Sequence, residues 1–114
     1  KVEKVGNYNL IYLLANKYPS KAFKIFIDEQ KKSYPKESII VLVSCDETKV
    51  SIIVGITEDL TNKFDATNFV KLASIIVGGK GGGGRKDLAQ AGGNKPENVE
   101  KIYVEIKNEI LKLV

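Results

Sequence analysis

The sequence predicts an α/β (α+β) sandwich in which a small, mostly antiparallel sheet packs with about three helices. Three observations lead to this fold class. Residues 38–45 and 50–56 are β-branched runs joined by four polar residues, which is a hairpin pattern. Three other segments carry apolar residues at helical spacing. A glycine-rich run stands between the second of these helices and a short predicted strand. A length of 114 residues fits one domain, so we expect 1–114 to form a single globular unit.

Three segments predict strands in the first half of the chain. Residues 7–15 are apolar and aromatic, and a strand is favoured because Gly6 precedes them and Pro19 follows them. Residues 38–45 form a continuous apolar run, typical of a strand buried on both faces. Residues 50–56 alternate and complete the hairpin.

The first two predicted helices have recognisable ends. Ser20 is a candidate N-cap for the first helix, which ends before Pro35. The second helix is expected to begin near Asp65 or Thr67, and Gly78 is a natural stop for it. Its inner face would carry Val70, Ala73, Ile76 and Val77.

The third helix closes the chain. Pro96 would lie in its first turn, with Glu97 and Glu100 near the positive end of the helix dipole. An apolar stripe at helical spacing predicts packing against the core. It is made of Val99, Ile102, Tyr103, Ile106, Ile110 and Leu113.

The absence of histidine excludes the commonest catalytic and metal-binding chemistry. Without it the chain has no Ser-His or Cys-His nucleophile pair and no histidine-containing zinc site. The single cysteine, Cys45, has no partner for an internal disulfide, and we expect a buried thiol in a cytoplasmic protein. No apolar stretch is long enough to span a membrane, so we expect no membrane partner.

Charge is distributed unevenly along the sequence. Residues 1–36 carry a net charge of +5 and residues 78–95 carry +3, while residues 37–77 between them carry −3. If the two basic segments meet in space they form one positive face, as a nucleic-acid partner requires. Charge alone favours an ordinary solvated surface.

The run GGKGGGGRKDLAQAGG, residues 78–93, is the strongest functional signal. Six of its first seven residues are glycine, whereas a tight turn needs one or two, so we favour ligand contact over a flexible loop. Gly79, Gly81 and Gly84 match the spacing of a dinucleotide-binding loop, but the run follows a predicted helix and opens none. Within residues 78–93 no Ser or Thr follows a lysine as a Walker loop requires, and the companion motifs of a kinase loop are missing.

The residue types in this run predict a nucleic-acid partner. Lys80, Arg85 and Lys86 would bind phosphates, helped by main-chain N–H groups. The bare glycine backbone would offer a flat surface to a base or base pair. On this interpretation we expect Gly82→Val to impair binding more than folding.

The same residues resemble the glycine-rich signature of the C-terminal domain of alanyl-tRNA synthetases, called C-Ala. Residues 50–60 (VSIIVGITEDL) and the closing Pro-Glu helix resemble that domain as well, so the resemblance covers nearly the whole chain. Two departures stand out. Lys86 occupies a position where the family usually has proline, and one extra glycine precedes Arg85.

The resemblance implies that the chain is a tRNA-binding domain cut from a longer enzyme, as its start at Lys1 and lack of methionine also suggest. The parent would attach alanine to tRNA(Ala) using ATP and deacylate mischarged Ser- and Gly-tRNA(Ala). This domain would bind the tRNA elbow and help couple aminoacylation to editing, and some members bind DNA or form homodimers. The resemblance implies no catalysis, metal or cofactor in this fragment. ATP and zinc would bind in other domains of the parent enzyme.

By the same resemblance, the loop would meet the elbow and Gln90 would reach a sugar or base edge, unless it satisfies buried backbone instead. The resulting nucleic-acid-binding set lies within the glycine run and its exit. It comprises Gly79, Lys80, Gly81, Gly82, Gly83, Gly84, Arg85, Lys86 and Gln90.

Two other functions stay open at this point. DHH-type phosphoesterases carry a related accessory domain whose glycine-rich loop holds a nucleotide or phosphodiester. Those loops typically place a histidine after the glycines, where this chain has Arg85 and Lys86. A dimerisation module with an incidental basic face is the third interpretation.

Overall fold

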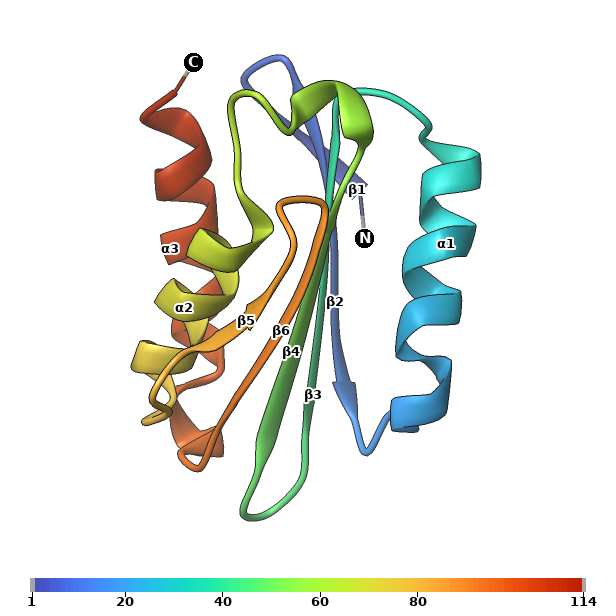
Figure 1. Cartoon of the computed structure of the whole chain (residues 1–114). Helices are drawn as coiled ribbons and strands as arrows, with labels where there is room; N and C mark the ends of the chain where they lie inside the picture. The colour runs from blue at the N-terminus through green and yellow to red at the C-terminus, as the bar shows by residue number, and fades with distance from the viewer. Residues whose placement is uncertain (1, 114) are drawn as a thin grey trace.

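The computed structural model describes residues 2–113, which form one curved sheet with helices on both faces (Figure 1). Within these residues the six strands lie in the order β1-β2-β3-β4-β6-β5. Only β2 and β3 pair in parallel, and every other neighbouring pair is antiparallel. The expected fold class is therefore confirmed.

The strands are β1 (Val2–Val5), β2 (Tyr8–Asn16), β3 (Ser38–Cys45), β4 (Val50–Ile56), β5 (Gly82–Gly84) and β6 (Leu88–Gly93). The α-helices are α1 (Phe23–Ser33), α2 (Ala66–Ile76) and α3 (Glu100–Leu111). Short 3-10 turns precede the helices at η1 (Ser20–Ala22), η2 (Glu58–Leu60) and η3 (Pro96–Asn98).

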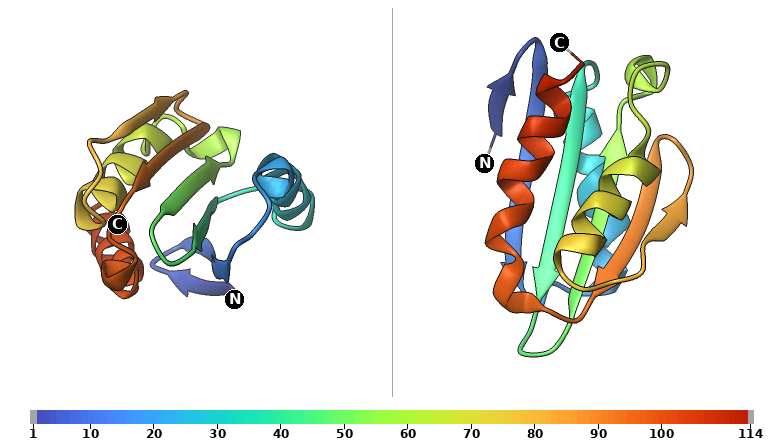
Figure 2. Two further views of the ribbon diagram at one scale, coloured as in Figure 1. Left: turned by 90° about the horizontal axis from the view of Figure 1, so that it is seen from below. Right: turned by 90° about the vertical axis from the view of Figure 1, so that its left-hand side faces the viewer.

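Strands β3 and β4 form the centre of the sheet because both of their faces are covered. Successive residues of β3, such as Val41 and Leu42, point to opposite faces, and both are fully buried. Figure 2 shows α1 alone on one face of the sheet and α2 with α3 on the other. The predicted hairpin of β-branched runs is thus the central element of the domain.

Each face of the sheet has its own apolar core. The smaller core joins α1 to the sheet through Ile11, Phe23, Ile27, Ile40, Leu42 and Ile53. The larger core joins α2 and α3 to the opposite face, and its helical members include Phe69, Val70, Ala73, Ile102, Ile106 and Ile110. Removal of these side chains from water is the main favourable term that holds the helices on the sheet.

The first strand is a feature that the sequence analysis missed. Strand β1 pairs with β2, with Val5 opposite Tyr8, and Gly6 and Asn7 form the connecting turn. Gly6 has a φ of +62°, which glycine adopts at little cost. The dipeptide Gly6-Asn7 is a hairpin signal that would have revealed this strand.

The start of the first helix also differs from the prediction. Ser20 makes no capping hydrogen bond, because the chain first forms a 3-10 turn in which the Ala22 N–H donates to the Pro19 carbonyl at 2.9 Å. Helix α1 then begins at Phe23 with Ala22 as its N-cap. At α2 the expectation is confirmed, since the Asp65 side chain accepts a hydrogen bond from the Thr67 N–H at 2.9 Å.

Some predicted core positions lie nearer the surface than expected. Leu113 follows the last turn of α3 and is 51% exposed. Ile76 and Tyr103 are half-buried at the edges of their stripes. Cys45 is half-buried rather than buried, because it ends β3 at the rim of the sheet. The other members of the predicted stripes are buried.

Tyr12 carries the one buried hydroxyl without a hydrogen-bond partner among residues 2–113. Its ring packs edge-on against Tyr103 with 5.0 Å between ring centroids. Burial, followed by the nearby Cys45 thiol, raises the pKa of Tyr12 from 10.0 to about 12. An unpaired hydroxyl in the core opposes folding, so the ring rather than the oxygen stabilises the domain.

We expect Tyr12→Phe to leave the free energy of unfolding unchanged or to raise it by about 1 kcal/mol, because the substitution removes an unpaired polar group. The unfolded tyrosine ionises near pH 10 and the folded one near pH 12. The wild type should therefore lose about 2–3 kcal/mol more than the variant as the pH rises from 10 to 12. Urea unfolding of both proteins over that range measures the difference. If both proteins lose the same free energy of unfolding between pH 10 and 12, Tyr12 does not titrate in this way.

Candidate nucleic-acid interface

Helix α2 ends in a glycine motif that begins the glycine-rich run. The Gly78 N–H donates to the Ile75 carbonyl at 3.2 Å, and the Gly79 N–H donates to the Ser74 carbonyl at 2.7 Å. Gly78 has a φ of +77°, so it is the left-handed residue that this C-terminal motif requires. The prediction that Gly78 stops the helix is confirmed.

Ser74 connects the glycine run to the sheet, and the sequence analysis missed it. Its side chain is fully buried, and its hydroxyl donates to the Gly92 carbonyl at 2.6 Å. The same oxygen accepts a hydrogen bond from the Gly81 N–H at 3.1 Å. Its place in the sequence was a usable signal, because it lies four residues after Val70 on the apolar stripe of α2.

Residues Gly82–Gly84 of the glycine run form strand β5, where a loop was predicted. Strand β5 pairs with β6 as an edge strand, with Gly83 opposite Gln90. Two hydrogen bonds between Arg85 and Leu88, at 2.8 and 3.3 Å, close the turn that joins them. Lys86 is the first central residue of this turn. Proline is favoured at that position, so the proline usual in the resembling family would fit the same turn.

Close packing explains most of the glycines. A Cβ at Gly79 would meet the Gly92 carbonyl and the Ser74 hydroxyl, and a Cβ at Gly82 would meet the Gln90 carbonyl and Ala91. Gly83 differs from both, because no atom of residues 2–113 lies within 4 Å of the place that its Cβ would take. The structure therefore gives most of this run a packing role and leaves Gly83 available for a ligand.

The open space at Gly83 belongs to a wider uncovered part of the sheet. Leu88 packs in the α1 core, so strand alternation places Gln90 and Gly92 on that same face. Helix α1 lies over β3 and β4 (Figure 2) and meets β6 at Leu88, whereas Gly83 and Gln90 are exposed farther along β5 and β6. We call this surface the open sheet face, defined by Ser51, Gly83, Arg85, Gln90 and Gly92.

Arg85 is held at one end of the open sheet face by its neighbour Asp87. Its Nε donates to Asp87 Oδ1 at 3.1 Å, while the side chain stays 70% exposed. Burial by itself would raise the pKa of Asp87, but the Arg85 hydrogen bond and charge outweigh it and hold that pKa below its usual value. At neutral pH the guanidinium is thus oriented and still has free donors for a second anion.

The other two predicted cations lie beyond opposite ends of β5. Lys86 is exposed in the turn, and Lys80 is exposed at the opposite end of β5, beside the C-terminus of α2. The two basic segments of the sequence do meet at one point. Lys31 of α1 donates to the Asp87 carbonyl at 3.5 Å, which brings α1 beside the turn. The structure places Gly83, Arg85 and Gln90 together and Lys80 apart from them.

Residues 2–113 contain neither a metal-binding cluster nor a membrane-spanning helix. No group of three or more Cys, Asp or Glu side chains is arranged to hold a metal ion there. Across the same residues, no helix has the length and apolar character that crossing a bilayer requires.

The contrast between Gly82 and Gly83 predicts opposite effects of the same substitution. We expect Gly82→Val to lower the free energy of unfolding by about 2–3 kcal/mol, because its Cβ would overlap the β6 backbone. Gly83→Val should stay within about 0.5 kcal/mol of wild type, because its side chain would enter open space. Urea unfolding of the pair measures both. Equal losses of stability in the two variants would contradict the packing role of Gly82. This packing role replaces our expectation that Gly82→Val mainly affects binding.

Comparison with known proteins gives consistent matches. The DHHA1 domain family matches residues 7–112 of the chain. An alanine–tRNA ligase of Chelativorans sp. (strain BNC1) is 41% identical over 96 residues, which are 84% of this chain and 11% of that protein. An alanine–tRNA ligase of Staphylococcus aureus (strain JH9) is 36% identical over 113 residues, or 99% of this chain and 13% of that protein. The chain thus spans about a tenth of the length of these relatives.

A solved structure shares the fold. The crystal structure of the C-Ala domain from Aquifex aeolicus alanyl-tRNA synthetase superposes with a TM-score of 0.89 at 24% identity, over 97% of this chain and 98% of that one. The resemblance to the alanyl-tRNA synthetase family that the glycine run suggested is confirmed. Since the family match extends over nearly its whole length, the chain belongs to the DHHA1 domain family.

Proposed function

We propose that this chain is the C-terminal tRNA-binding domain of an alanine–tRNA ligase and that it binds the tRNA elbow through the open sheet face. The observation that carries the proposal is Gly83. It is exposed, it stands opposite Gln90, and packing does not require it to be glycine. A flat, bare backbone suits contact with the face of an exposed base pair, which a side chain would hold at a distance.

The relatives support the assignment to a ligase. The curated relatives named above are alanine–tRNA ligases, and each aligns with this chain over a small part of its own length. The parent enzyme would attach alanine to tRNA(Ala) with ATP and deacylate mischarged Ser- and Gly-tRNA(Ala) in other domains. ATP and zinc would bind in those domains, while this one would bring one tRNA to both reactions.

The charges at the turn suit the backbone of an RNA. Arg85 is oriented by Asp87 and keeps free N–H donors, and Lys86 beside it is exposed. Arginine binds phosphate in a fork that lysine cannot form, so Arg85 is the stronger of the two candidates. Gln90 is exposed on the same face and offers an amide to a sugar or base edge.

The accessory domain of a DHH-type phosphoesterase is the less favoured function. The relatives named above are ligases, and Arg85 and Lys86 stand where such phosphoesterase loops typically have a histidine. Binding of a mononucleotide in place of folded tRNA would favour the phosphoesterase function.

Fluorescence anisotropy tests whether the domain binds the tRNA elbow. It compares intact folded tRNA with an acceptor-stem hairpin of equal charge density, which lacks the elbow. We expect tighter binding of the intact tRNA, with an affinity that falls as salt rises because phosphates contribute. Equal affinity for the two RNAs would reduce the site to a generic basic surface.

We expect Arg85→Ala to weaken tRNA binding by about tenfold, because it removes a forked phosphate contact. Lys101→Ala is the matched control, since Lys101 is exposed on α3 across the sheet. It should change the dissociation constant by less than about twofold, because long-range charge effects are screened. The same anisotropy titration measures both variants. Equal losses would mean that net charge, and not the open sheet face, governs binding.

A further inference from the structure

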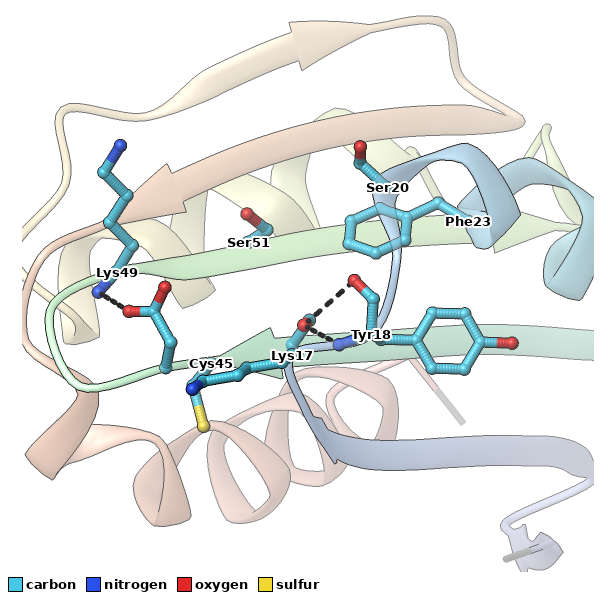
Figure 3. A pocket seen from close by; sticks show the side chains of 9 residues that line it. Lys17, Tyr18, Ser20, Phe23, Cys45, Lys49 and Ser51 are labelled. Carbon is cyan, nitrogen blue, oxygen red and sulfur yellow. Dashed lines mark hydrogen bonds between the residues drawn. The ribbon is translucent and has the colours of Figure 1, made fainter.

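A cavity of about 250 Å³ opens at the end of the sheet where β2 and β3 finish and β4 begins. Its polar lining comes from three separate segments (Figure 3). Lys17 and Ser20 lie in the connection from β2 to α1, Lys49 lies in the turn between β3 and β4, and Ser51 lies on β4. Neither the predicted site nor the glycine run includes any of these residues.

The cavity continues the open sheet face. Ser51 lines the cavity and is also the residue of β4 that stands opposite Gly92 of β6. From Gly92 the face runs along β6 past Gln90 to the turn at Arg85. This length of strand covers about 15 Å, which is enough for a few nucleotides of RNA.

We propose that RNA bound on the open sheet face extends into this cavity, where Lys17 and Lys49 bind its phosphates. This inference rests on the proposed function and adds a second contact region at the far end of the same face. The segments that supply it are distant from the glycine run in sequence, and the pairing of β4 with β6 brings Ser51 beside Gly92.

Both lysines are free to bind an anion. Within residues 2–113 no carboxylate lies within ion-pair distance of Lys49. Lys17 Nζ is 3.5 Å from Glu47 Oε1, but these side chains are 63% and 81% exposed. Such an exposed pair contributes little, so a phosphate can replace Glu47 at small cost.

The carboxylate in the cavity is already occupied. Asp46 Oδ1 accepts hydrogen bonds from the N–H groups of Thr48 and Lys49, each at 2.8 Å, and from the Thr48 hydroxyl at 3.3 Å. The N–H of Thr48, then that of Lys49, lower the pKa of Asp46. The carboxylate is therefore held by the β3–β4 turn and stays ionised, and its charge attracts Lys17. The Lys49 ammonium, which has no carboxylate partner among residues 2–113, is thus the freer of the two cations.

Besides Ser44, whose hydroxyl accepts a hydrogen bond from the Tyr18 N–H, two serines add hydroxyls to the lining. Ser20 makes no capping bond at the start of η1. Ser51 is exposed at the junction with the open sheet face. Serine hydroxyls commonly donate to phosphate oxygens in nucleic-acid complexes, so both add donors beside the lysines. The cavity thus offers two cations and neutral donors to a sugar-phosphate backbone, beside one carboxylate that the β3–β4 turn holds.

Lys49→Glu tests this contact, with Lys101→Glu on α3 as the control of equal charge change. We expect Lys49→Glu to raise the dissociation constant for folded tRNA by about five- to tenfold and to reduce the salt slope by about one, as for a lost phosphate contact. Lys101→Glu should stay within about twofold. Anisotropy at three salt concentrations gives both quantities, and thermal melting confirms that each variant is folded. Lys49→Gln provides a milder second variant.

The outcomes separate this inference from the proposed function. A loss at Lys49 without a loss at Lys101 supports the cavity contact. Equal losses of affinity in the two variants overturn the cavity contact. It is also overturned if Lys49→Glu binds tRNA as tightly as the wild type while Arg85→Ala binds more weakly, and that result leaves the proposed function intact. Failure of the wild type to bind folded tRNA overturns both.

Discussion

The hydroxyl of Ser74 is the contact on which the glycine run depends. It donates to the Gly92 carbonyl and accepts from the Gly81 N–H, so one buried oxygen joins α2, the run and β6. A buried hydroxyl with both roles filled costs little, whereas either partner left alone would be an unpaired polar group in the core. The run can approach this closely only where glycines leave room, as Gly79 does against Gly92.

This close approach decides which part of the glycine run remains accessible. Once Gly79 and Gly82 pack against Ser74 and β6, only Gly83 presents open space. Strand pairing then sets Gly83 beside Gln90, on the part of the face beyond Leu88 where both residues are exposed. The packing of the run and the exposure of the open sheet face are therefore two results of one arrangement.

Each cation along this face has a different electrostatic environment. Arg85 is oriented by Asp87 at the turn, and Lys80 stands at the other end of β5 beside the carbonyl end of α2. A cation near a helix C-terminus is stabilised by the helix dipole, while an anion there is not. The dipole thus favours phosphate contact at the turn over contact at Lys80, a distinction that net charge does not reveal.

The sequence by itself determined the elements whose signals are local. The apolar runs of β3 and β4, the Asp65 cap and the Gly78 stop follow from the preferences of neighbouring residues. It also predicted that the glycine run is the functional region. Tertiary structure decided the rest, because contacts between distant segments assign Ser74 its partners. Pairing of β5 with β6 likewise turns glycines into a strand and singles out Gly83. No local pattern encodes which glycine will have a neighbour, since that neighbour lies elsewhere in the chain.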